Sequence, residues 1–171
     1  QGASLTLTLT RTLTLTQAAK AHLDSAKVQA RVTRALSNLS VHEENKARIA
    51  STLGIVTLIE SSFEHAESAE VQAGVAGALR NLSVNDEIAE EIATAGGIDA
   101  LILASENHPS NSDVQAEVAG ALWGLSVNDE IEEAIAAADG IRILVEAARN
   151  HFQNAKVQAR VAGALRKLSA N

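Results

Sequence analysis

The sequence predicts an all-α solenoid, in which short helices stack in repeated units along one direction. A Val-Gln-Ala motif recurs four times at a constant spacing of 43 residues, and a period of about 40 to 47 residues is typical of units of two or three helices. Within each unit the apolar residues follow a helical period. The 171 residues, 46% hydrophobic and 20% charged, suffice for a folded core. The motifs begin at Val28, Val71, Val114 and Val157.

Each unit is predicted to open with a short helix, called helix A. Asn85 can cap its N-terminus, and Asp86 and Glu87 favour the positive end of the helix. One unit earlier His42 replaces the asparagine, and we expect it to be a substitute cap. Helix A should stop at residues 96–97, because glycine readily adopts the left-handed conformation of a C-cap. The equivalent glycines are Gly54 and Gly140.

Two longer helices complete the unit. Helix B contains Ile98, Leu101 and Ile102 at helical spacing and ends near residues 108–109. Helix C opens with a capping residue three places before the valine of the motif. These caps are Ser25, Ser68, Asn111 and Asn154. Helix C carries an apolar stripe that one unit alone cannot bury. In the second copy the stripe is Val71, Val75, Ala78, Leu79 and Leu82.

The chain is predicted to be a single domain, residues 1–171, with one partial unit and three full units. Leucine and threonine alternate near the N-terminus, which in isolation is a strand pattern. The register of the repeat instead places residues 12–22 at the end of a helix B. Residues 1–10 are compatible with either conformation. The partial unit spans 12–40, and the full units span 42–83, 85–126 and 128–169.

Three segments of the repeat resemble the armadillo repeat, especially its long regular arrays in protists and in large multidomain signalling proteins. They are residues 78–83 (Ala-Leu-Arg-Asn-Leu-Ser), 85–87 (Asn-Asp-Glu) and 92–98 (Ile-Ala-Thr-Ala-Gly-Gly-Ile). The resemblance covers nearly the whole chain. It implies a right-handed superhelix whose helices C line a concave groove that receives an extended peptide. Such arrays bind many unrelated proteins, so the resemblance implies a protein-binding module without naming its partner.

The resemblance also implies two ladders of side chains in the groove. An asparagine ladder would bond the peptide backbone, and it is half present here. Its positions are Asn38, Asn81, Gly124 and Lys167. A tryptophan ladder one turn earlier, as in importins, is absent, which disfavours an importin-like receptor for nuclear localisation signals. Its positions are Arg34, Gly77, Gly120 and Gly163. Glycine weakens an isolated helix by about 1 kcal/mol relative to alanine, so these glycines indicate close packing or a groove shape.

Projection of helix C places six basic residues on or near the groove against one acid, whereas the acids of the chain concentrate in helix A. A basic groove favours recognition of an acidic or phosphorylated protein segment by arginine. The alternative is an ordinary solvated face whose charges pair locally. The basic residues are Arg31, Arg34, Arg80, Arg160, Arg166 and Lys167, and the acid is Glu117.

Trp123, the only tryptophan, occupies a position where the other units carry serine or arginine. It is therefore not expected in the core. One interpretation is an aromatic anchor for a partner, in a shallow pocket beside Gly120 and Gly124. The other is stacking on a neighbouring arginine or packing between helices.

Four histidines share the 43-residue period. Equivalent points of neighbouring units should lie about 8 to 10 Å apart, too far for shared metal coordination near 2 Å. We therefore expect no metal site, and histidines that bind carbonyls at the end of helix B and favour its negative end. They are His22, His65, His108 and His151.

Several functional classes are disfavoured by composition. A net charge of -7 and few aromatic residues argue against nucleic acid, and no stretch is apolar enough for membrane insertion. Phosphate loops, carboxylate pairs and nucleophile elbows are missing, so neither an enzyme nor a cofactor is expected. The absence of cysteine and of a secretory leader favours an intracellular, cytoplasmic protein.

Two functions stay open. In the first, the groove binds an extended, acidic protein segment. In the second, the chain is a structural scaffold, one part of a longer solenoid or of a larger complex, and the groove holds no ligand.

Overall fold

The computed structural model describes residues 2–169, and the side chains from residue 10 onward. Within this range the chain forms eleven α-helices and no strand. The helices are α1 (Gly2–Ala21), α2 (Ala26–Leu39), α3 (Glu43–Ser51), α4 (Gly54–Glu64), α5 (Ala69–Leu82), α6 (Asp86–Thr94), α7 (Gly97–Asn107), α8 (Ser112–Leu125), α9 (Asp129–Ala137), α10 (Gly140–Asn150) and α11 (Ala155–Leu168).

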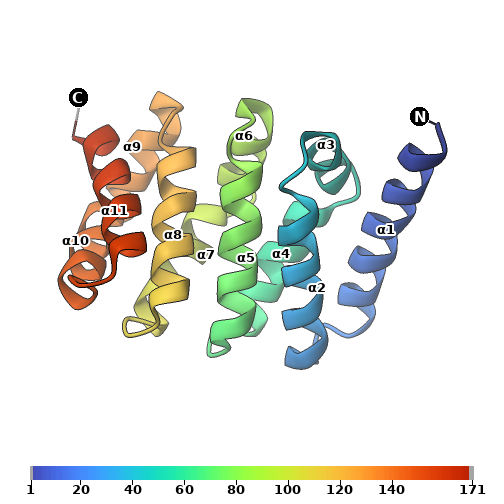
Figure 1. The fold of residues 1–171 in the computed structure, drawn as a ribbon, viewed down its shortest axis with the longest axis horizontal. Helices are drawn as coiled ribbons and strands as arrows, with labels where there is room; N and C mark the ends of the chain where they lie inside the picture. The colour runs from blue at the N-terminus through green and yellow to red at the C-terminus, as the bar shows by residue number, and fades with distance from the viewer. Residues whose placement is uncertain (1, 170–171) are drawn as a thin grey trace.

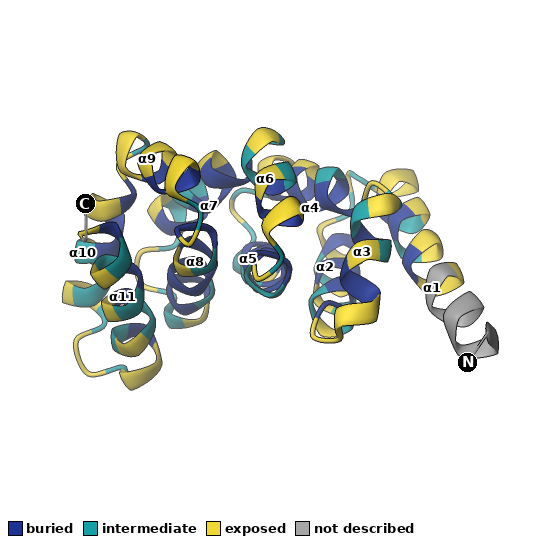
Figure 2. Cartoon of the chain, turned by 90° about the horizontal axis from the view of Figure 1, so that it is seen from above, coloured by how far each residue is buried: buried dark blue, intermediate teal, exposed yellow. Residues whose placement is uncertain are grey.

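After α1 and α2, three triplets of helices follow, α3–α5, α6–α8 and α9–α11, and each helix begins 43 residues after its counterpart. The triplets lie side by side along the longest axis of the molecule (Figure 1). Seen from above, the array is curved, and α2, α5, α8 and α11 form a row along its concave side (Figure 2). These four are the helices C of the sequence analysis.

The N-terminal residues form a helix and not a strand, because threonines share one helical face. Thr12 and Thr16 are four residues apart, and both side chains are buried, as is Ala19. The Thr16 hydroxyl donates to the backbone oxygen of Leu13 at 3.0 Å, which satisfies its polar group inside the helix. Thr12, Thr16 and Ala19 lie on the face of α1 that packs against α2 and α4. This helical spacing of buried residues favours a helix over the strand that the alternation of leucine and threonine would suit. Residue 1 lies outside the described residues.

The predicted stripe of helix C is the core of the protein. All ten stripe positions of α5 and α8 are at most 2% exposed. Successive helices C make the most extensive contacts in the array, α2 with α5, α5 with α8 and α8 with α11. The stripe therefore packs between neighbouring helices C. The ten residues are Val71, Val75, Ala78, Leu79, Leu82, Val114, Val118, Ala121, Leu122 and Leu125.

The junction of helices A and B differs from the prediction. The left-handed residues are Leu53, Gly96 and Asp139, with φ of 58°, 90° and 65°. The glycine after each of them begins helix B, so a C-cap role for Gly54 and Gly140 was wrong. Close packing explains these glycines instead. A Cβ would lie 2.6 Å from the Ile49 oxygen at Gly54, and 2.7 Å from the equivalent isoleucine oxygens at Gly97 and Gly140.

Most predicted caps are confirmed. The Asn85 side chain accepts from the Ile88 amide at 3.0 Å. Ser25 and His42 occupy N-cap positions but make no side-chain cap bond, so the capping role predicted for both side chains was wrong. The caps of helix C that do bond a backbone amide are Ser68, Asn111 and Asn154.

A glutamine ties helix B to helix C in every unit, and it is buried in the first three copies and half-buried in the last. The amide nitrogen of Gln72 donates to the backbone oxygens of Ser62 at 2.8 Å and His65 at 2.9 Å. Ser62 in turn donates its hydroxyl to the Gln72 oxygen at 2.7 Å. These bonds close the C-terminal end of α4 against the first turn of α5. The same amide bonds are made by Gln29, Gln115 and Gln158.

The histidine ladder joins neighbouring units. Nε2 of His65 lies 2.6 Å from the Leu23 oxygen, Nε2 of His108 lies 2.8 Å from the Ala66 oxygen, and His151 repeats this contact with Pro109 at 2.9 Å. The predicted role of binding carbonyls is confirmed for these three of the four histidines, but each carbonyl belongs to the B–C turn of the preceding unit. Together with the glutamines, these contacts give successive units the same spacing.

We expect Leu79→Ala to lower the free energy of unfolding by about 2 to 5 kcal/mol, because the side chain is fully buried between units and leaves a cavity. Urea unfolding followed by circular dichroism measures the loss. The control Val84→Ala truncates an exposed side chain and should change stability by under about 0.5 kcal/mol. Equal losses in the two variants would contradict the burial of the stripe.

Candidate functional site

A groove of about 940 Å³ lies over α2 and α5 and reaches the first turns of α8. It brings together six of the ten predicted site residues. They are Arg31, Arg34, Asn38, Arg80, Asn81 and Glu117. The other four do not line it. They are Trp123, Arg160, Arg166 and Lys167.

One wall of the groove carries positively charged side chains that form no ion pair with other described residues. Lys27, Arg31 and Arg34 follow one face of α2, and all three are exposed. None of them forms an ion pair within the part of the chain that the structure describes. Sequence reasoning missed Lys27. The available signal was its place in the repeat, where the other units carry Glu70, Asp113 and Lys156.

Acids also line the groove, so the prediction of Glu117 as its single acid was wrong. Glu70 and Asp113 stand in the first turns of α5 and α8 and are exposed. Asp113 has one ion pair, with Lys156 at 3.9 Å. The groove is therefore basic along α2 and mixed in charge towards α8.

Glu117 of α8 is held by cations from the helices on both sides. Its Oε2 lies 2.7 Å from Nε of Arg80 on α5, and 2.9 Å from a guanidinium nitrogen of Arg160 on α11. Its Oε1 lies 2.9 Å from Nζ of Lys156. Burial alone would raise the pKa of Glu117, but the contacts with Lys156, Arg80 and Arg160 together hold that pKa below its usual value. The carboxylate thus joins three successive helices C.

Most of the predicted cations from Arg80 onward form ion pairs within the protein. Arg80 and Arg160 are bound to Glu117. Lys167 lies 3.3 Å from Glu132 and 3.5 Å from Asp129, at the start of α9. Arg166 is exposed on α11. For Arg80, Arg160 and Lys167, the alternative of locally paired charges describes the structure.

The two asparagines of the ladder differ. Asn38 is exposed in the groove beside Arg34. The amide nitrogen of Asn81 donates to the Ser37 backbone oxygen at 3.0 Å and to the Ser40 hydroxyl at 3.2 Å. Asn81 therefore bridges α5 to α2, and its side-chain nitrogen is not available to a ligand.

Trp123 lies against the next helix C, which supports the interpretation of packing between helices over that of an anchor beside Gly120 and Gly124. A Cβ at Gly163 would lie 2.7 Å from the indole ring, so the ring lies against the backbone of α11. Arg80 covers Gly120, and Ser83 covers Gly124. Trp123 is 39% exposed, and its contact is with the next helix C.

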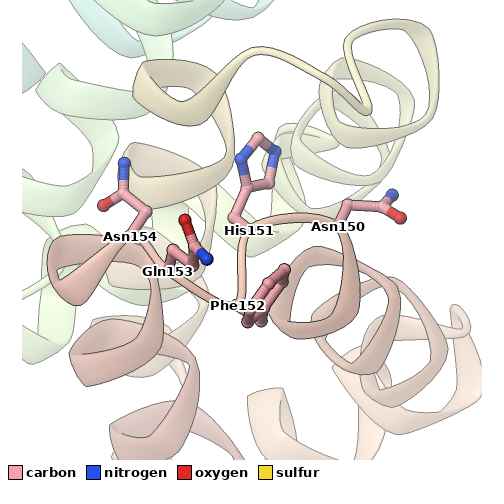
Figure 3. A pocket seen from close by; sticks show the side chains of 5 residues that line it. All are labelled: Asn150, His151, Phe152, Gln153 and Asn154. Carbon is pink, nitrogen blue, oxygen red and sulfur yellow. The ribbon is translucent and has the colours of Figure 1, made fainter.

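A second hollow, of about 330 Å³, lies at the turn between α10 and α11 (Figure 3). Five consecutive residues, 150–154, line it, and no other element contributes. The side chains of His151 and Phe152 point in different directions (Figure 3). His151 already binds the Pro109 oxygen of the preceding turn. No set of groups converges there on a common ligand.

Two further observations concern the described residues as a whole. Among them no three histidine, cysteine or acidic side chains are grouped so as to hold a metal ion. No helix in residues 2–169 combines the length and apolar character that crossing a bilayer requires.

Comparison with known proteins bears on the fold. No protein-family model and no curated protein sequence matches the chain. A crystal structure of an engineered protein has a similar fold, with a TM-score of 0.78 and 26% sequence identity. The match covers 93% of this chain and 62% of the engineered one, so this chain spans less than two thirds of that protein's length. The likeness is consistent with an all-helical repeat fold.

Because the folded-state pKa of Glu117 is lowered, the ionised carboxylate stabilises the fold above the unfolded value of about 4.3, and this contribution disappears as the pH falls through the folded value. We expect Glu117→Gln to reduce the free energy of unfolding by about 1 to 3 kcal/mol at neutral pH. The difference from the unmodified chain should shrink as the pH falls below about 4.

Urea unfolding at pH 7 and pH 3 measures both effects. Asp113→Asn is the matched control, because this acid is exposed and its one ion pair is long. It should leave stability at pH 7 nearly unchanged. A loss in Glu117→Gln that is the same at both pH values would show that the ion pairs contribute nothing.

Proposed function

We propose that the protein is an armadillo-type, right-handed superhelix that binds an extended, acidic protein segment in its concave groove. The observation that carries the proposal is the cationic wall of Lys27, Arg31 and Arg34, which is exposed in the groove and unpaired among the described residues. A surface charge that pairs with nothing inside the protein is available to a ligand. The proposed role is binding, without catalysis or a cofactor.

The chemistry of this wall suits carboxylates and phosphates. Arginine offers planar, bidentate hydrogen bonds to both groups. Arg31 and Arg34 supply two guanidinium groups within one turn of α2, and exposed Asn38 follows one turn later. An asparagine at this place can bond the backbone of an extended segment. The ligand would thus be held by its acidic side chains and by its main chain.

The net charge of -7 does not oppose local binding of an acid. At physiological ionic strength, interactions between exposed charges are largely screened beyond about 8 Å. The three cations on α2 therefore dominate the potential that a bound segment meets in this half of the groove. Binding should weaken as salt is added. The excess of acid elsewhere, together with few aromatic side chains, argues against nucleic acid as the partner.

A second function, as a scaffold in a larger complex or longer solenoid, is favoured by the outer face of α11. Three side chains there are less covered than their counterparts in α8, although the residues are the same. Ala159 and Ala162 are exposed and Leu165 is half-buried, whereas Ala116, Ala119 and Leu122 are fully buried. Another helical unit or subunit could cover this face. We propose an intracellular, cytoplasmic location for either role, in keeping with the absence of cysteine.

We expect Arg31→Glu with Arg34→Glu to lower the affinity for an acidic peptide about tenfold or more, because two attractions become repulsions. Fluorescence anisotropy of a fluorescein-labelled, glutamate-rich peptide of about 12 residues measures the affinity, at low and at high salt. Arg80 stays unchanged in this variant, since it holds Glu117.

The control is Arg11→Glu with Arg149→Glu, which alters the net charge equally but lies on α1 and α10, outside the groove. It should bind like the unmodified chain. Equal loss in both variants would mean that overall charge and not the groove governs binding. Intact binding in the groove variant would favour the scaffold function.

A further inference from the structure

The outer side of α11 lies at one end of the array (Figure 1) and repeats the side of α5 that packs against α8. Four of its residues are identical to residues of α5 that stand two repeats of 43 residues earlier. The counterparts in α5 are Ala76, Leu79, Arg80 and Ser83. We call the four residues of α11 the α11 face, and they are Ala162, Leu165, Arg166 and Ser169.

The α11 face lacks the cover that the same residues have inside the array. In α5 the alanine, leucine and serine are at most 3% exposed, whereas Ala162 and Ser169 are exposed and Leu165 is half-buried. On α10, behind this face, Ile141 is 39% exposed, although the equivalent Ile98 is 8% exposed. A partner that covers this end would therefore bury apolar surface that the inner units already bury.

The packing of α8 on α5 shows what a helix needs in order to cover such a face. Glu117 binds Arg80, with Oε2 2.7 Å from Nε. Gly120 leaves room for the stem of that arginine, because a Cβ there would lie 2.5 Å from Cδ of Arg80. Gly124 lies directly against the Ser83 side chain. The covering helix thus carries a glutamate and, three and seven residues later, glycine.

Arg166 has no carboxylate of this kind. It is exposed and forms no ion pair within residues 2–169. The other three cations of α11 each bind an acid, and α11 itself contains no acidic residue. The α11 face therefore combines an uncovered apolar surface with one unpaired positive charge, which is complementary to the face that α8 presents to α5.

A second copy of the chain does not supply the missing carboxylate. If its α2 stacked on α11 as α8 stacks on α5, Arg31 would take the place of Glu117 and Arg34 that of Gly120. These arginines would face Arg166, and like charges in close contact are unfavourable. Two α11 faces against each other would bring two cationic helices together without an acid on either. The charges therefore favour a different protein as the partner.

We infer that the α11 face binds an amphipathic helix of a separate protein, which carries a glutamate followed by glycines three and seven residues later. The glutamate binds Arg166, the first glycine accommodates the stem of this arginine, and the second packs against Ser169. This inference rests on the scaffold role, the second function proposed above, and is independent of the groove.

The test uses a fluorescein-labelled peptide with the 14-residue sequence of α8. A side-chain crosslink keeps it helical, because free helices of this length are marginal in water. We expect Arg166→Glu to lower its affinity about tenfold or more, because an attraction becomes a repulsion. A peptide with Glu117→Lys should show the reverse preference and bind Arg166→Glu about tenfold more tightly than the unmodified chain. Fluorescence anisotropy measures all four affinities.

Two further variants locate the binding. Arg31→Glu with Arg34→Glu disables the groove and should bind the α8 peptide like the unmodified chain. Ala162→Gln places a longer, neutral side chain on the α11 face and should weaken binding about tenfold or more. Because the substituted side chains are exposed, all variants should keep the helical circular dichroism of the unmodified chain.

Equal binding by the unmodified chain and Arg166→Glu, with loss in Ala162→Gln, would overturn the glutamate helix and leave the scaffold role standing. Absence of binding, or binding that Ala162→Gln does not change, would overturn both. Loss in the groove variant would place the peptide in the groove and overturn the inference. Sedimentation velocity should show a monomer, and a dimer that Ala162→Gln abolishes would identify a second copy as the occupant instead.

Discussion

The glutamine of each Val-Gln-Ala motif, buried in three of the four copies, is the constraint on which the array depends. A side-chain amide without partners inside a protein costs about 1 to 3 kcal/mol, so its bonds to the end of helix B must form. In Gln72 these bonds fix α4 against α5, and His65 then fixes the unit to the preceding turn. Because every full unit repeats both contacts, the helices C come to lie in one row. The groove is a consequence of that row.

The close packing of neighbouring helices C also determines which charged side chains form ion pairs within the protein. Where α8 meets α11, Glu117 is close enough to bind Arg160 and Lys156, and it also draws Arg80 from α5. Three cations of α11 and Arg80 of α5 therefore form ion pairs inside the protein, whereas Arg166 stays exposed. On α2 the cations Lys27, Arg31 and Arg34 line the groove and form no ion pair among the described residues. The cations are unpaired at the α2 end of the groove and paired near α8. This difference follows from the residues at each end, because the backbone fold of the units is the same.

Local chemistry made much of the fold predictable. The start of helix C and its buried stripe were predictable, because the cap and the apolar spacing each depend on residues close together in the sequence. The helical conformation of residues 2–10 was not predictable, since leucine–threonine alternation also suits a strand. From residue 12 onward the register of the repeat predicted the helix, and Thr12 and Thr16 are buried on one face of it. In the site, the row of helices C was predicted, whereas the pairing of Lys167 with α9 was not. Ion pairs between helices depend on distances that one sequence does not contain.

The central claim is that an acidic segment binds the concave face at α2. Nuclear magnetic resonance tests it directly, by titrating ¹⁵N-labelled protein with a glutamate-rich peptide and recording the backbone amide shifts. The account predicts the largest shifts on α2 and on the facing side of α5, around Arg31, Arg34 and Asn38. Shifts confined to helices A, or to the outer face of α11, would contradict it.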